Sequence, residues 1–151
     1  MGNTQVICDV FSRFTVEKEV VERCTQEDRK DIMGRTQRKA CGEGLDENIR
    51  HPYMWCGKIH YDIDAEDFYN FPYAFGALFS LGLYRMYQKE GAAFVSRYDT
   101  LLTNTPRMDT ETATGSVGID ITTPGFWEDS LEALAGNVEQ YEQLAETLTA
   151  R

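Results

Sequence analysis

The sequence has little positive charge. It contains 15 Lys and Arg against 25 Asp and Glu, which gives a formal net charge of −10 over 151 residues. Nucleic-acid binding relies on a cationic surface that neutralises phosphates, so this balance disfavours nucleic acid as a partner. The densest basic stretch, residues 23–39, also contains Glu27, Asp28 and Asp31. We interpret it as the solvated face of a helix.

Long apolar runs and export signals are also lacking. The longest apolar run, Phe71–Tyr84, covers 14 residues, whereas a membrane-spanning helix needs about 20. The N-terminal residues show no cationic region followed by an apolar stretch, so we expect no secretory signal. Without export, four cysteines that form no C-x-x-C pair are expected to be reduced and mostly buried: Cys8, Cys24, Cys41 and Cys56. These features predict a cytoplasmic protein without a membrane partner.

Familiar catalytic motifs are missing as well. The chain has no G-x-S-x-G, no phosphate-binding P-loop and no G-x-G-x-x-G. His51, Cys56 and His60 could supply three nitrogen and sulfur ligands to a catalytic zinc ion. Neither a C-x-x-C nor an H-x-x-x-H pair nor a nearby Glu base accompanies them. We therefore prefer the interpretation that these three residues have unrelated roles, and we expect no metal site in this chain.

Helical periodicity dominates the sequence and predicts an all-α fold. Apolar spacing and Gly or Pro punctuation indicate helices over about 6–24, 26–40, 72–89, 92–102 and from 124 onward. The segment 45–55 is expected to be irregular or briefly helical. We predict a compact bundle of about five to six helices forming a single domain over residues 1–151. The helix over 72–89 should be central and buried, and the last helix carries a regular apolar stripe from Trp127 to Leu148.

One imidazole and several phenol groups gather around the start of the predicted central helix. They belong to His60, Tyr61, Tyr69 and Tyr73. Such groups can donate hydrogen bonds to a developing oxyanion or hold a peptide carbonyl. Tyr73 is expected in the first turn, at the positive end of the helix dipole. An alternative is that these aromatic residues simply pack in a core, as aromatic residues at helical spacing usually do.

Two stretches carry a resemblance to a known family. They are H-P-Y-M-W-C-G-K-I-H-Y, over 51–61, and D-F-Y-N-F-P-Y-A-F-G-A-L-F-S-L-G-L-Y, over 67–84. Together they resemble the C-terminal region of the oligoendopeptidase F family of zinc metallopeptidases, relatives of thimet oligopeptidase. Further similar segments extend the resemblance over nearly the whole chain. Family members usually have a second Tyr at the position of Asp62.

The resemblance implies specific roles for the aromatic group. His60 and Tyr73 match positions that stabilise the tetrahedral intermediate, and Tyr61 and Tyr69 match positions that bind the substrate backbone. The fold implied is all-helical, with this portion lining one wall of a substrate channel. The family's zinc ligands, an H-E-x-x-H helix and a downstream Glu, lie upstream of the matching region, and this chain contains no H-E-x-x-H.

We therefore expect a substrate-channel portion of a peptidase that hydrolyses short peptides but is inactive as an isolated chain. Its partners would be a peptide and the upstream zinc-binding half. Whether the chain is an enzyme in its own right stays open at this point. The alternative is a self-contained, non-catalytic module that binds peptides or forms a homo-oligomer, because the loss of an upstream half would expose apolar helix faces.

Overall fold

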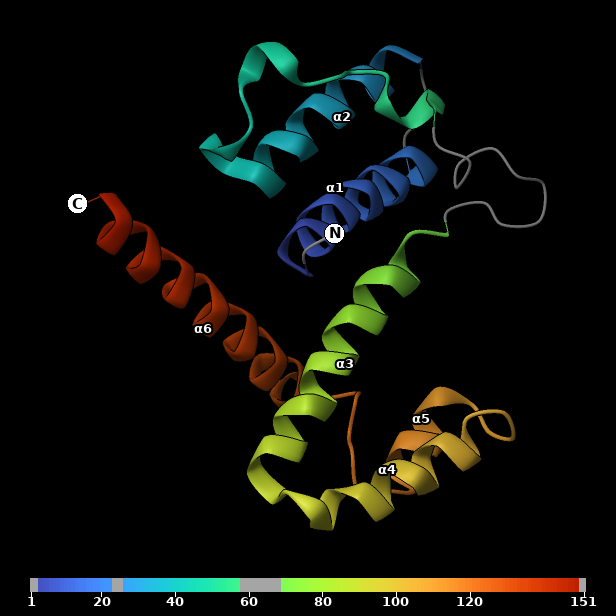
Figure 1. Ribbon diagram of the computed structural model, residues 1–151. Coiled ribbons are helices and arrows are strands. Elements are labelled where there is room, and N and C mark those ends of the chain that lie inside the picture. The colour runs from blue at the N-terminus through green and yellow to red at the C-terminus, as the bar shows by residue number, and fades with distance from the viewer. Residues whose placement is uncertain (1–2, 23–25, 58–68, 150–151) are drawn as a thin grey trace. The chain divides into compact units, whose positions relative to one another are not determined.

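The structure is a computed structural model that describes residues 3–22, 26–57 and 69–149. Over these ranges the chain is all-helical, without strands, as the sequence predicts. The α-helices, drawn in Figure 1, are α1 (Asn3–Glu22), α2 (Gln26–Cys41), α3 (Phe71–Glu90), α4 (Ala92–Asn104), α5 (Thr110–Gly115) and α6 (Pro124–Thr149). None of these helices has the length and apolar character needed to cross a membrane. The chain divides into two compact units, Met1–Ala77 and Leu78–Arg151.

The first unit is built on α1 and α2, which pack against each other (Figure 1). Their apolar faces meet in a small core of Val16, Ile32 and Met33. Val20, Met54 and Trp55 cover this core as partly buried side chains. The amphipathic spacing that predicted the two helices therefore also supplies the side chains that hold them together.

The segment after α2 runs back along that helix (Figure 1). It contains three short 3-10 helices, η1 (Gly42–Gly44), η2 (Glu47–Ile49) and η3 (Met54–Gly57). Gln37 Nε2 of α2 donates a hydrogen bond of 3.3 Å to the carbonyl oxygen of His51. The Lys30 ammonium lies 5.8 Å from the centre of the Tyr53 ring. This confirms the irregular, briefly helical connection predicted for residues 45–55.

The second unit packs the latter part of α3 with α4, α5 and the start of α6. Its buried core consists of Leu101, Ala113, Val117 and Ile119, with Phe79, Leu83, Met86, Ile121 and Phe126 packed around it. Gly91, with φ of 63° and ψ of −139°, takes a positive-φ conformation that glycine adopts readily and that lets α3 end and α4 begin at once. Arg97 Nη2 donates a 2.7 Å hydrogen bond to the carbonyl oxygen of Val117 and so ties α4 to the segment after α5.

Close packing in the second unit depends on Gly82 of α3. This glycine is the one buried residue of the helix. A Cβ at this position would lie 2.4 Å from Cζ of Phe126 and 2.6 Å from Oγ of Ser130, both on α6. The absence of a side chain therefore allows α6 to approach α3.

Two helices are more exposed than the sequence pattern predicted. In α3, Phe71 and Tyr84 are both 57% exposed, so the helix is not the buried centre that its apolar composition suggested. In α6, Tyr141 and Leu148 are more than 70% exposed. The apolar stripe of α6 is therefore packed near its start, around Trp127, and exposed toward its end.

Candidate functional site

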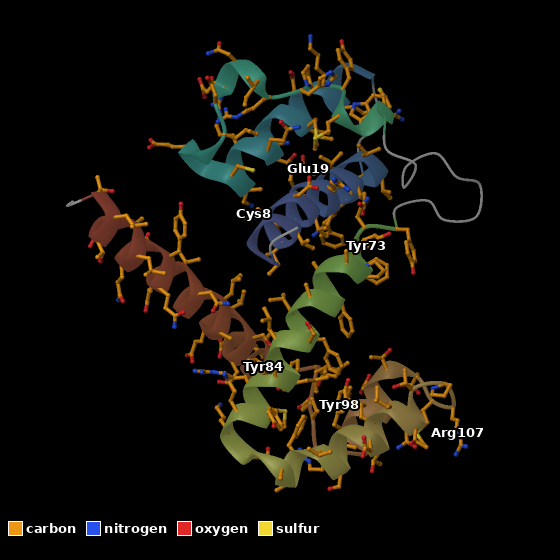
Figure 2. All side chains as sticks on the ribbon, in the orientation of Figure 1. Cys8, Glu19, Tyr73, Tyr84, Tyr98 and Arg107 are labelled. Carbon is orange, nitrogen blue, oxygen red and sulfur yellow. The ribbon has the colours of Figure 1, made fainter. Side chains whose placement is uncertain are left out.

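The candidate site that the sequence suggests is at the start of α3. Tyr69 lies just before the helix, and Tyr73 lies in its first turn, labelled in Figure 2. Their ring centroids are 6.3 Å apart at an interplanar angle of 83°, an edge-to-face contact. The two side chains are 43% and 48% exposed, respectively. The structure thus brings together two of the four predicted residues as an exposed pair rather than as buried core aromatics.

The other two predicted residues, His60 and Tyr61, lie outside the described residues. His60 is also the third member of the possible zinc set. His51 and Cys56, the remaining members, are both exposed, and His51 Nδ1 accepts a 3.1 Å hydrogen bond from the backbone N–H of Tyr53. Over residues 3–22, 26–57 and 69–149, no group of three or more His, Cys, Asp or Glu side chains is arranged to hold a metal ion. The described part of the chain therefore offers no built zinc site.

A buried polar network fixes the start of α3 to α1. Asn70, which follows Tyr69 and directly precedes the helix, is fully buried. Its Nδ2 donates a short hydrogen bond to the carboxylate of Glu17, and its Oδ1 accepts one of 3.3 Å from Arg13 Nη1. Arg13 is in turn paired with Asp9 one turn earlier in α1. The backbone carbonyl of Asn70 accepts a 3.2 Å hydrogen bond from the N–H of Tyr73. The network therefore positions the turn that presents both tyrosines.

Glu17 is the most constrained ionisable group of this network. It is only 4% exposed, and burial raises the pKa of its carboxyl group. The hydrogen bond from Asn70 and the charge of Arg13 act in the opposite direction and are the smaller influences. A buried carboxylate is tolerated when it is paired and hydrogen-bonded. Asn70 and Arg13 provide these partners.

We predict that Glu17→Gln changes the pH dependence of stability. Because the folded state holds the Glu17 proton more tightly than the unfolded state, stability falls as pH rises from the unfolded pKa, about 4.3, through the raised folded pKa. Glutamine does not titrate, so the free energy of unfolding of this variant should rise relative to the natural chain as the pH rises from the unfolded to the raised folded pKa. Urea unfolding followed by circular dichroism at several pH values measures this difference.

Glu22→Gln is the matched control, because Glu22 lies exposed at the end of the same helix. Its pH profile should run parallel to that of the natural chain. Parallel profiles for Glu17→Gln as well would contradict the role assigned to the buried carboxyl group.

Sequence reasoning missed this network, although one signal pointed to it. Glu17 lies seven residues after Val10 and three before Val20, so it falls on the apolar face of α1. A charged residue on such a face needs a partner, and the partner here is 53 residues away in the chain. The spacing within α1 indicates the buried charge but contains no information about Asn70.

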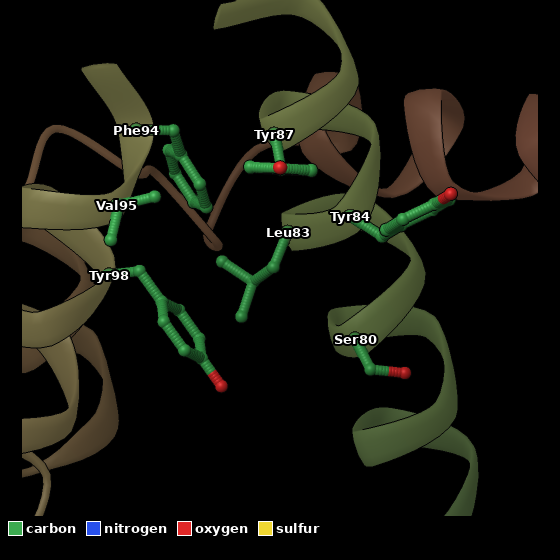
Figure 3. Close-up of a pocket in the computed structure, with 7 residues that line it drawn as sticks. All are labelled: Ser80, Leu83, Tyr84, Tyr87, Phe94, Val95 and Tyr98. Atoms are coloured by element: carbon green, nitrogen blue, oxygen red, sulfur yellow. The ribbon is translucent and has the colours of Figure 1, made fainter. Parts of the chain in front are cut away.

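A separate apolar hollow lies in the second unit, between α3 and α4 (Figure 3). It has a volume of about 390 Å³ and is lined by Ser80, Leu83, Tyr84, Tyr87, Phe94, Val95 and Tyr98. The lining contains two aromatic pairs, one on each helix, with ring centroids 6.5 Å apart in α3 and 6.3 Å apart in α4. The hollow is apolar and therefore suits a nonpolar group. Its lining residues do not form an evident set of catalytic side chains.

Comparisons with protein-family models, with curated proteins and with solved structures gave no match for this chain.

Proposed function

We propose that this chain is the C-terminal substrate-channel portion of an oligoendopeptidase F-like zinc metalloendopeptidase. It would line the channel in which short peptides are hydrolysed, and it would be inactive as an isolated chain. Zinc and the base that activates its water would come from the upstream half. The motif F-Y-N-F-P-Y-A-F-G, over residues 68–76, carries this proposal because it is specific and its tyrosines are the residues to which the resemblance gives a role.

The geometry of the described residues supports the proposal. Tyr69 and Tyr73 are exposed side by side, and each can donate a phenol hydrogen bond. Tyr73 lies in the first turn of a helix, where the dipole favours negative charge. In the assembled enzyme Tyr73 would donate a hydrogen bond to the oxyanion, while Tyr69 would hold a substrate carbonyl. As the resemblance implies, His60 would help to stabilise the tetrahedral intermediate, and Tyr61 would help to bind the substrate backbone.

The zinc chemistry would be supplied by a partner. The described residues do not form a metal site, and we derive no catalytic step of this chain through the metal. In the parent family the bound zinc lowers the pKa of its water and polarises the scissile carbonyl. The contribution of this chain is to position and stabilise the substrate, and oxyanion donors contribute only a few kcal/mol. Such a contribution is of no use without the group that attacks the carbonyl.

The first test measures zinc content by elemental analysis and cleavage of a quenched peptide by the purified chain. We expect neither stoichiometric zinc nor cleavage. The chain is then co-expressed with the upstream zinc-binding half of an oligoendopeptidase F enzyme, and we expect cleavage to appear. In this complex Tyr73→Phe should reduce kcat by about 10²- to 10³-fold, as the loss of one oxyanion donor does.

Tyr87→Phe is the matched control, because this tyrosine belongs to the same helix and is similarly exposed, at 47%. It should leave kcat unchanged. One zinc ion per isolated chain together with chelator-sensitive cleavage would overturn the proposal. The residues to mutate would then be His51, Cys56 and His60.

The exposed end of α6 favours a second candidate function, a self-contained module that forms a homodimer. Its exposed apolar side chains are Leu131, Val138, Tyr141, Leu144 and Leu148. Exposed apolar surface of this kind tends to find a partner. Light scattering after size exclusion distinguishes the two candidates. A stable dimer that Tyr141→Lys converts to monomer would favour the module, whereas a monomer that assembles only with the zinc-binding half would favour the peptidase portion.

A further inference from the structure

A basic hollow lies beside α2 in the first unit, away from the tyrosine pair. It is open to solvent and has a volume of about 520 Å³. Seven residues line it, four of them cationic and one acidic: Lys30, Asp31, Gly34, Arg35, Arg38, Arg50 and Pro52. The chain as a whole has a formal charge of −10, so this concentration of cations runs against the overall balance. The sequence pattern alone indicates only a solvated helix face for the part that belongs to α2.

The base of the basic hollow is one face of α2. Lys30, Gly34 and Arg38 follow each other at intervals of four residues, so they lie on the same side of the helix. A Cβ at Gly34 would meet no atom within 4 Å. Packing therefore does not require glycine here, and glycine also makes the interior of a helix less stable than alanine does. Its missing side chain leaves the space between the two cations open.

The opposite wall contains a fixed guanidinium group. The side chain of Arg50 is only 9% exposed. Its Nη2 donates hydrogen bonds to the carbonyl oxygens of Gly42, at 3.3 Å, and Leu45, at 3.1 Å, and its Nη1 pairs with Glu47 at 3.0 Å. The 3.3 Å bond from Gln37 to the His51 carbonyl holds the neighbouring backbone on α2. Arg50 is therefore a pre-positioned positive charge.

The acidic partners of the lining arginines do not prevent an anion from binding. Glu47 pairs with Arg50 and also with Arg38, at 3.1 Å, so one carboxylate serves two guanidinium groups. The Arg38 and Arg35 side chains are 68% and 62% exposed, and Arg35 pairs with Glu19. The ion pair of Arg38 with Glu47, in which both side chains are more than 60% exposed, contributes little to stability. Arg38 can therefore turn toward a ligand at small cost, whereas Arg35 is held by two hydrogen bonds to the carboxylate of Glu19 and contributes its charge from that position.

We propose that the basic hollow binds a small oxyanion with at least two negative charges, of the phosphate-ester or diphosphate class. Guanidinium groups match the geometry of phosphate oxygens and bind them through paired hydrogen bonds. Lys30 adds a point charge, and the space above Gly34 receives the anion. A nucleic-acid polymer is disfavoured because the remainder of the chain would repel it. This inference does not depend on the proposed peptidase function.

The test is a titration of the full chain with sodium pyrophosphate. Backbone amide NMR monitors the titration, and sodium chloride holds the ionic strength constant. We expect saturable shifts confined to the amides of residues 30–38, Arg50 and His51. Lys30→Gln and Arg38→Gln should each weaken binding about fivefold or more, because each removes a charge next to the ligand. Titration with citrate distinguishes the class of oxyanion: weaker binding than pyrophosphate supports phosphate, and equal or tighter binding contradicts the phosphate assignment.

Gly34→Leu is the decisive variant. Leucine favours a helix more than glycine does, so the variant should melt no lower than the natural chain while its side chain fills the basic hollow. We expect pyrophosphate binding to be lost in this stable protein. Lys18→Gln removes an exposed charge of α1 outside the lining and should leave binding unchanged. Unchanged binding by Gly34→Leu, or shifts that stay linear up to about 10 mM, would refute the proposal.

Discussion

Asn70→Ala should lower the free energy of unfolding of the first unit by about 2–4 kcal/mol. Asn70 is fully buried, and its amide donates to a carboxylate that is itself 4% exposed. The variant leaves the Glu17 charge in place without this donor and removes the acceptor that Arg13 Nη1 uses at 3.3 Å. Leaving a buried charge short of partners costs more than the hydrogen bond itself contributes. Urea unfolding followed by circular dichroism at pH 7 measures the change.

A double-mutant cycle tests whether the buried charge is the cause. In a Glu17→Gln background the same Asn70→Ala change should cost clearly less, because no charge is then left without its donor. Asn48→Ala is the matched control. Asn48 is exposed, and within the described residues its side chain bonds to the nearby Asp46, so we expect a change within about 0.5 kcal/mol. Equal costs of Asn70→Ala in both backgrounds would show that the Glu17 charge is not the source of the loss.

Gly82→Ala should lower the stability of the second unit by about 1–2 kcal/mol. The new methyl group would lie 2.4 Å from Phe126 and 2.6 Å from Ser130, far inside ordinary van der Waals contact. Overpacking of this kind typically costs about 1–3 kcal/mol, and the better helix propensity of alanine returns up to about 1 kcal/mol. A Trp55→Phe background leaves Trp127 of α6 as the only tryptophan. Its fluorescence then reports unfolding of this unit.

Gly76→Ala in the same helix is the matched control. A Cβ there would meet no atom within 4 Å, so the change should leave stability unchanged or raise it by up to about 1 kcal/mol. The two substitutions are chemically identical and differ only in what the added methyl group contacts. A Gly82→Ala variant as stable as Gly76→Ala would mean that α6 does not pack closely on α3 at this point.

The sequence predicted the helices well because their signals are local. The helix expected over 26–40 is observed as Gln26–Cys41, and the one expected over 72–89 as Phe71–Glu90. Pro72 near the start and Gly91 at the end explain the accuracy of the second, since both residues act on their own backbone. Burial was predicted less well. The apolar run of α3 indicates that the helix needs a surface to pack against. It does not indicate whether the rest of this chain supplies that surface.

The difference between local signals, which the sequence contains, and burial or long-range contacts, which it does not, also applies to the cysteines and the candidate site. Cys8 and Cys41 are half-buried free thiols, but Cys56 is exposed, contrary to the expectation of mostly buried thiols, and Cys24 lies outside the described residues. Tyr69 and Tyr73 were identified from a local motif, and their proximity follows from the turn that leads into α3. Arg13, Glu17 and Asn70 join segments more than 50 residues apart, and no local pattern in a single sequence specifies such a pairing. Asn70, whose substitution we expect to cost most, is therefore a position that sequence reasoning missed.

The contact between Glu17 and Asn70 also sets an order of events in folding. It joins residues 53 positions apart, and closing a flexible loop of that length costs about 3.5 kcal/mol plus a constant. The pairing of α1 with α2 joins residues such as Val16 and Ile32, 16 positions apart, so its closure cost is about 1 kcal/mol smaller and it should form first. The first turn of α3 would then dock last and open first. Amide hydrogen exchange should accordingly be faster at Tyr73 than in the middle of α2, so that the pair of Tyr69 and Tyr73 lies on the part of the first unit that opens most easily.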